Sequence, residues 1–290
     1  MAKPILVTGA HRSGTTWVGK MITNSPSVHY IHEPFNIDYS PLKVKPGYWF
    51  QYITGENESF IHEQIEQLLT PKAAPQKSKG GKQWAKFLKP GVEKQRILIK
   101  DPIAIFSVEW LASRFDMDVV IMIRHPAAFV ESIIEQNWTH DFSHFLNQPL
   151  LMKEHLFPFE AEIKKFTKTK CDIFDQAILL WKLIYYMVNK YRQKHKDWLY
   201  IKHEELSAEP LKGFKKIFRF INVKCPGEIK KIILEHSSSI NPVDGDAHSI
   251  KRDSKSIIKK WKNKFTQEEI KKIREGVDDI SKDFYTDEDW

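Results

Sequence analysis

The sequence has few cysteines, and its apolar residues form no long uninterrupted run. Only Cys171 and Cys225 occur, far apart and outside any CxxC pattern, which gives no basis for a disulfide framework or a zinc site and favours a reducing compartment. The longest apolar stretch, residues 178–188, is interrupted by Lys182, and residues 1–6 contain no separate apolar signal region. We therefore expect a cytoplasmic protein without a transmembrane anchor.

The charge is basic, with a formal net value of +8, which favours an anionic partner. Two stretches, residues 72–96 and 251–264, are rich in lysine and arginine. Neither is accompanied by a pattern that reads nucleic acid, so no nucleic-acid partner is expected. Hydrophobic residues make up 41% of the chain, enough for the core of a globular protein. We expect residues 1–290 to form a single domain.

Short apolar runs alternate with helical patterns along most of the chain. Strands are expected at residues 5–8, 28–31, 96–100, 118–123 and 198–202, and helices at 15–23, 61–69, 103–114, 127–136, 171–191, 211–221 and 228–236. Runs that are apolar throughout are typical of strands buried on both faces of a parallel sheet. The order predicts an α/β fold: a doubly wound, mainly parallel sheet with helices on both faces and a site at the strands' carboxyl ends.

Two segments interrupt this alternation and are interpreted as insertions. Residues 40–95 are rich in proline, glycine and lysine, and we interpret them as a partly mobile insertion over one face. Residues 139–170 show no clear period. The second segment contains several phenylalanines that either pack beneath a helix or line an acceptor cleft: Phe142, Phe145, Phe157, Phe159 and Phe166.

The first strand leads into a P-loop-like phosphate-binding loop. Residues Gly9 to Gly14 have the GxxxxG spacing of such loops, but Thr15 stands where a nucleotide triphosphatase has its lysine. Because that lysine reaches β- and γ-phosphates, its absence favours a donor with one 5'-phosphate and a small transferred group. Backbone N–H groups from Ser13 to Trp17, at a helix N-terminus, can still bind that anion.

With the run Arg12-Ser13-Gly14-Thr15-Thr16, the sequence resembles the family of sulfotransferases that use 3'-phosphoadenosine 5'-phosphosulfate (PAPS). The loop of that family typically reads K/R-S-G-T-T/S. The resemblance implies that Arg12, Thr15 and Thr16 contact the 5'-phosphosulfate. It also places Trp17 where some members stack the adenine.

A second match concerns the 3'-phosphate of PAPS. The strand at 118–123 is followed by Arg124 and, eight residues later, by Ser132, an arrangement that resembles the family's 3'-phosphate site. The guanidinium of Arg124 forms a fork for phosphate oxygens, and Ser132, two turns into the next helix, can direct its hydroxyl at the same group.

Further correspondences lie towards the C-terminus. The segment from Lys202 to Pro210 resembles R-Y-E-D-L-x-x-x-P, although His203 replaces the usual tyrosine. Residues 261–265 resemble the end of a cofactor loop of cytosolic members. Ser254, Lys255 and Ser256 stand at its beginning, where those members read R-K-G. The resemblance assigns Lys255 to the cofactor, with Arg252 as a nearby substitute.

Sulfuryl transfer needs an acceptor oxygen in line, a base for its proton and cations for the developing charge. Arg12 is the expected cation, and Lys100 either assists it or forms an ion pair with Asp101. Glu33 is the expected base, because Glu33-Pro34 resembles a stretch of carbohydrate sulfotransferases in which a glutamate has been proposed for that role. His32 is the alternative base, and the alternative role for Glu33 is structural, binding loop N–H groups or Arg12.

The predicted function is transfer of a sulfuryl group from PAPS to an acceptor hydroxyl of a carbohydrate or glycolipid. The cytosolic type of C-terminal motif favours small phenols or alcohols instead. Two alternatives stay open: a non-catalytic protein that binds PAPS or another nucleotide, and a P-loop kinase, for which the loop lysine and a magnesium-binding aspartate are not evident. No metal is expected, since protein cations suffice for the chemistry.

Overall fold

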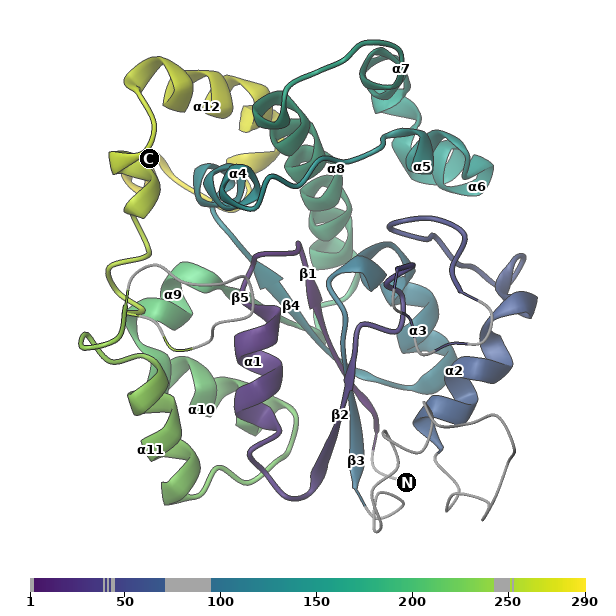
Figure 1. The fold of residues 1–290 in the computed structure, drawn as a ribbon. Coiled ribbons are helices and arrows are strands. Elements are labelled where there is room, and N and C mark those ends of the chain that lie inside the picture. The colour runs from purple at the N-terminus through teal and green to yellow at the C-terminus, as the bar shows by residue number, and fades with distance from the viewer. Residues whose placement is uncertain are drawn as a thin grey trace.

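The computed structural model describes residues 3–38, 40, 42, 45–70, 95–242, 251 and 253–290. Within these residues one parallel sheet has helices on both faces (Figure 1), which confirms the predicted fold class. The strands are β1 (Ile5–Gly9), β2 (Val28–His32), β3 (Arg96–Lys100), β4 (Asp118–Ile123) and β5 (Leu199–Lys202), in the spatial order β2-β3-β1-β4-β5.

Helices follow most of the strands. They are α1 (Thr15–Ile22), α2 (His62–Leu69), α3 (Val108–Phe115), α4 (Pro126–Glu135), α5 (Ser143–Leu146), α6 (Pro149–Leu151), α7 (Glu160–Lys168), α8 (Ile173–Lys194), α9 (His203–Ala208), α10 (Pro210–Phe220), α11 (Gly227–His236) and α12 (Gln267–Ser281). In the described part of the chain, no helix is both long and apolar enough to cross a lipid bilayer.

The side chains of each strand alternate between two apolar layers. Ile5 and Val7 of β1 pack with α1, α10 and α11, whereas Leu6 packs on the opposite face with α3, α4 and α8. Figure 1 shows these two groups of helices on the two sides of the sheet. Since successive side chains of a strand point to opposite faces, an all-apolar run such as Val119 to Ile123 fills both layers.

The helices differ from the expectations in several places, and α9 was not among those predicted. Residues 139–170, which show no clear period in the sequence, contain α5, α6 and α7, with further helical turns between α6 and α7. The helix expected at 103–114 begins as a 3₁₀ turn, Ile103–Ser107, before α3. The C-terminal α12, whose capping box joins Thr266 and Glu269, was not predicted. Residues 71–94, most of the first expected insertion, lie outside the described part of the chain.

The topology has its switch point at the carboxyl edge of the sheet, where folds of this type bind ligands. From β1 the chain proceeds to β2 and β3 on one side, then returns to β4 on the other side of β1. Loops that leave adjacent strands in opposite directions leave a binding crevice between them. The residues that follow β1, β2, β3 and β4, which include the phosphate loop, Glu33, Asp101 and Arg124, all lie at this edge.

Candidate active site

Two glycines give the phosphate loop its shape. Gly9 has φ 140° and Gly14 has φ 89°, both in the region that residues with a β-carbon rarely adopt. A β-carbon on Gly9 would collide with the backbone of Met122, and one on Gly14 would lie 2.7 Å from Cδ2 of His203. The loop therefore packs closely between β4 and α9, and only glycine fits at these two positions.

The loop places the N-terminus of α1 at the carboxyl edge of the sheet. Gly14 is the N-cap and offers no side-chain cap, so the first-turn N–H groups are available to an anion. Ser13 is held inside the loop, because its N–H and its hydroxyl both donate to the carbonyl of Ala10. Thr15 is buried, and Thr16 is partly exposed.

Arginine side chains from two elements meet at this loop. The guanidinium Nε of Arg12 donates to Oγ of Ser132 on α4 over 2.8 Å, and the same group lies over the ring of Trp138. Arg124 donates from Nη1 to the carbonyl of Arg12. The residues expected at the 5'-phosphosulfate and at the 3'-phosphate are therefore in direct contact in the folded chain.

Buried polar atoms without hydrogen-bond partners lie in the same region, as expected for a site that binds an anionic nucleotide. Nε of Arg124 and Nε1 of Trp17 are buried without a hydrogen-bond partner among the described residues. Buried donors normally have partners, so both are suited to ligand oxygen or nitrogen atoms. The ring of Trp17 itself is buried, edge-on to Phe214 and His203, and its stacking on adenine stays a prediction.

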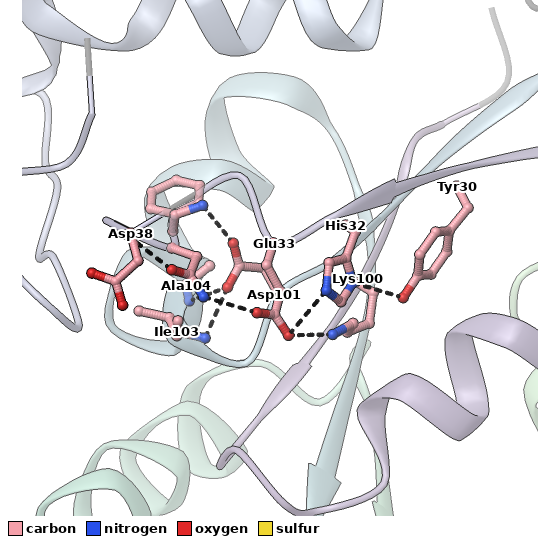
Figure 2. Close-up of polar contacts among 10 residues, drawn as sticks. Tyr30, His32, Glu33, Asp38, Lys100, Asp101, Ile103 and Ala104 are labelled. Atoms are coloured by element: carbon pink, nitrogen blue, oxygen red, sulfur yellow. Dashed lines mark hydrogen bonds and ion pairs between the residues drawn. The ribbon is translucent and has the colours of Figure 1, made fainter. Parts of the chain in front are cut away.

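A buried ion pair lies at the ends of β2 and β3 (Figure 2). Nζ of Lys100, whose side chain is fully buried, donates to Oε1 of Glu33, and Asn36 donates to Oε2 over 3.1 Å. Nε2 of His32 lies 3.9 Å from the same Oε1. Burial lowers the pKa of Lys100, and the carboxylate of Glu33 opposes that shift. Glu33 has φ 43°, a strained backbone that is common at functional sites.

Asp101 does not pair with Lys100 but supports the loops after β2 and β3. Its carboxylate accepts N–H bonds from Phe35 over 2.6 Å, from Ile103 over 2.9 Å and from Ala104 over 3.3 Å. Burial and the neighbouring Glu33 raise the pKa of Asp101 to about 7, although these N–H groups favour the charged form. The alternative expectation of a Lys100–Asp101 ion pair is therefore wrong, and Lys100 pairs with Glu33.

Two neutral histidines belong to the phosphate loop or pack against it. His11 packs edge-on to Phe129, and burial together with the charge of Arg12 lowers its pKa to about 4. His203 is buried against Gly14, and burial, with smaller effects from Arg124 and Arg12, lowers its pKa well below the ordinary value. Both rings are therefore uncharged at neutral pH and leave the positive charge of the site to the arginines.

Ser254 and Lys255, at the beginning of the expected C-terminal cofactor loop, lie near the C-terminal end of α9. Oγ of Ser254 donates to the carbonyls of Ser207 and Ser237, over 2.9 Å and 3.2 Å. Lys255 is exposed and lines a pocket of about 970 Å³ together with residues of α10 and the segment after α11. Arg252 lies outside the described residues.

Several residues at the site were not predicted. Asn36 holds the carboxylate of Glu33, and Tyr185 of α8 accepts the N–H of Arg124 over 2.7 Å. Glu204, noted only as part of a motif, accepts the N–H of His125 over 2.9 Å. Asn36 lies three residues from Glu33 and was within reach of local reasoning, but the contact of Tyr185 spans 61 residues and has no local signal.

Comparisons with known proteins show the family to which the chain belongs. The model of the sulfotransferase family matches residues 4–226, so the chain belongs to the sulfotransferase family. No curated protein matches the chain. The structure is similar to a sulfotransferase domain from the curacin biosynthetic pathway, with a TM-score of 0.53 and 14% identity over 96% of this chain and 98% of that one.

The mouse sulfotransferase SULT7A1, solved in complex with 3'-phosphoadenosine 5'-phosphate (PAP), matches with a TM-score of 0.47 and 15% identity, over 100% of this chain and 87% of that one. Family membership makes the chain an enzyme that transfers sulfuryl groups from PAPS to a hydroxylated acceptor. The kinase and the non-catalytic alternatives are thereby set aside. Among the described residues no group of three or more His, Cys, Asp or Glu side chains is arranged to hold a metal ion.

Proposed function

We propose that PAPS binds across the loop between β1 and α1, with its 5'-phosphosulfate at Arg12 and residues 13–17. The proposal rests on the contact between Arg12 and Ser132, which brings the two phosphate-binding motifs together. The 3'-phosphate is assigned to Arg124 and Ser132, with Lys255 as a further cation. The buried, unpaired Nε of Arg124 supports this assignment, since a phosphate oxygen would satisfy it.

In this arrangement the chain's own groups supply charge and a base. PAPS brings the sulfuryl group, and PAP is the leaving group. Arg12, which stays charged at any working pH, stabilises the negative charge that develops on the bridging oxygen. Glu33 accepts the proton of the acceptor hydroxyl, and the ion pair with Lys100 orients that carboxylate. His32, beside the same oxygen, is the second candidate for the base.

For the acceptor we propose a hydroxyl of a carbohydrate or glycolipid. The support is Glu33-Pro34 at the end of β2, which resembles the corresponding stretch of carbohydrate sulfotransferases. A hydroxyl of a sugar has a high pKa and needs a base of this kind. For the compartment we propose the cytoplasm, since Cys171 and Cys225 are both free thiols and free thiols persist in reducing surroundings.

Calorimetric titration with PAP, AMP and ATP tests the donor site. We expect PAP to bind at least about tenfold more tightly than AMP or ATP, because one charge-assisted phosphate contact contributes about 1.5–3 kcal/mol. Equal affinities would overturn the assignment of Arg124 and Ser132. A panel of sugars, glycolipids, phenols and alcohols with labelled PAPS then tests the acceptor class, and turnover on phenols alone would overturn the carbohydrate proposal.

A further inference from the structure

Arg124 lies where the chain leaves the sheet, and its peptide groups need partners from elsewhere. β4 ends at Ile123, which pairs with Lys202 of β5, and α4 begins at Pro126. The N–H groups of Arg124 and His125 and the carbonyl of Arg124 belong to neither the sheet ladder nor the helix, whereas the carbonyl of His125 accepts the N–H of Phe129 in the first turn of α4. Buried backbone groups in such a position are normally satisfied by side chains.

Side chains of α8 and α9 hold this junction. The N–H of Arg124 donates to the hydroxyl of Tyr185 over 2.7 Å, and Nε1 of Trp181 donates to the carbonyl of Arg124 over 3.0 Å. The next N–H, of His125, donates to Glu204 over 2.9 Å. Tyr185 and Trp181 lie one turn apart on α8, and their rings stack at 4.2 Å between centroids. Both are buried and rigid partners for the junction.

The fixed junction determines where the guanidinium of Arg124 lies. Its Nη1 reaches the carbonyl of Arg12 in the phosphate loop, and the Nε remains for a ligand. A displacement of the Arg124 backbone would carry both nitrogen atoms away from the loop. Loss of a contact that supports a binding residue lowers the affinity for the ligand, even when the supporting residue does not touch the ligand.

We propose that Tyr185 is a positioning residue for the 3'-phosphate: its hydroxyl fixes the backbone of Arg124 and so orients the guanidinium. Burial raises the pKa of this hydroxyl far above its ordinary value, so the oxygen stays a neutral acceptor throughout the working range. The inference rests on the proposed assignment of Arg124 to the 3'-phosphate and adds the residue that holds it.

The test is the variant Tyr185→Phe, which removes one oxygen and keeps the stacked ring. We expect PAP affinity to fall about threefold to tenfold, as for the loss of one hydrogen bond to a neutral partner, while AMP affinity changes less than about twofold. Tyr191→Phe is the matched control, since Tyr191 is an equally buried tyrosine of α8 that packs on Trp198; it should leave both affinities unchanged.

A double-mutant cycle separates this inference from the donor site itself. Tyr185→Phe should cause no further loss of PAP affinity in an Arg124→Ala background, because both changes act through one guanidinium. If Arg124→Ala weakens PAP and AMP equally, the proposed 3'-phosphate site is wrong. If Arg124→Ala weakens PAP alone while Tyr185→Phe has no effect, or has the same effect in both backgrounds, only the role of Tyr185 is overturned.

Discussion

Nε of Arg12 donates a 2.8 Å hydrogen bond to Oγ of Ser132, although 120 residues separate them in the chain. The bond joins the loop after β1 to the second turn of α4. In the proposed donor site Arg12 serves the 5'-phosphosulfate and Ser132 the 3'-phosphate, so one contact connects the residues that bind the two ends of the donor. Loss of the Ser132 hydroxyl should therefore lower the binding affinity most for a ligand that carries both groups.

For Ser132→Ala we expect PAP affinity to fall about fivefold, the effect of one hydrogen bond worth about 1 kcal/mol. AMP affinity should fall less, because AMP lacks the group that Ser132 contacts. Titration calorimetry measures both values. Ser113→Ala on α3, whose hydroxyl donates to the carbonyl of Trp110, is a control that should leave both unchanged. Equal losses of affinity for PAP and AMP would indicate that Ser132 orients Arg12 and does not contact the 3'-phosphate.

Gly14→Ala tests the close packing of the phosphate loop. The new β-carbon would lie 2.7 Å from the ring of His203 at a φ of 89°, and we expect a loss of about 2 kcal/mol in the free energy of unfolding, with PAP binding lost. Gly227→Ala is the matched control, since a β-carbon there meets no atom within 4 Å. Urea unfolding and PAP titration of both variants give the comparison.

A second variant separates the two causes. Adding His203→Ala to Gly14→Ala removes the collision but not the unfavourable φ. We expect the double variant to recover part of the PAP affinity that Gly14→Ala loses. No recovery would show that backbone conformation alone makes glycine necessary at this position.

The strands were predictable because of how they are buried. β3 and β4 have the bounds that the sequence predicts, since strands covered on both faces are continuous apolar runs with polar ends. Residues 139–170 were not predictable, because α5 and α6 are too short to show a period and α7 buries only Ile163. α12 does show one, with Ile273, Val277 and Ile280 on its buried face, but the abundant charged residues concealed it.

For the site, local motifs predicted the loop after β1 and the arginine after β4. Which side chains contact the site residues depended on the fold. Adjacent residues at a strand end point to opposite faces, which is why Lys100 and Asp101 do not pair although they are neighbours in sequence. Lys100 instead meets Glu33, which comes from the neighbouring strand. The contact of Tyr185 with Arg124 requires knowing that α8 lies against the end of β4, and no pattern in the sequence states that.

Stability should fall steeply in acid because buried histidines resist protonation. Burial lowers the pKa of His140 to about 3 from an ordinary value of 6.5. As the pH falls, His140 therefore takes up a proton in the unfolded chain before it does so in the folded chain. The neutral ring contributes its full stabilisation above pH 6.5, and this contribution decreases as the pH falls from 6.5 towards 3. Each such group contributes a slope of about 1.4 kcal/mol per pH unit.

His140→Phe removes one of these groups and keeps an aromatic ring among Phe50, Phe142 and Phe145. It also removes Nε2, which is buried without a partner among the described residues. We expect the slope of unfolding free energy against pH to decrease by about 1.4 kcal/mol per unit between pH 6 and 4. Urea unfolding at several pH values measures this slope, whatever the change in absolute stability. An unchanged slope would mean that His140 titrates alike in both states.

Glu33→Gln should lower turnover by about a hundredfold or more while PAP affinity stays within about twofold, because an amide cannot accept the acceptor's proton. His32→Ala should retain most of the turnover if Glu33 is the base. The opposite pattern, with turnover lost in His32→Ala and kept in Glu33→Gln, would assign the base to His32. Steady-state rates with labelled PAPS, measured on both variants, distinguish the two.

The same substitution also leaves Lys100 buried without its carboxylate, and a lost buried ion pair costs about 3–5 kcal/mol. A fall in turnover could then reflect a damaged fold. The double variant Glu33→Gln/Lys100→Met removes both charges, and we expect it to regain much of the thermal stability but none of the turnover. Recovered turnover in the double variant would show that Glu33 serves to neutralise Lys100 and is not the base.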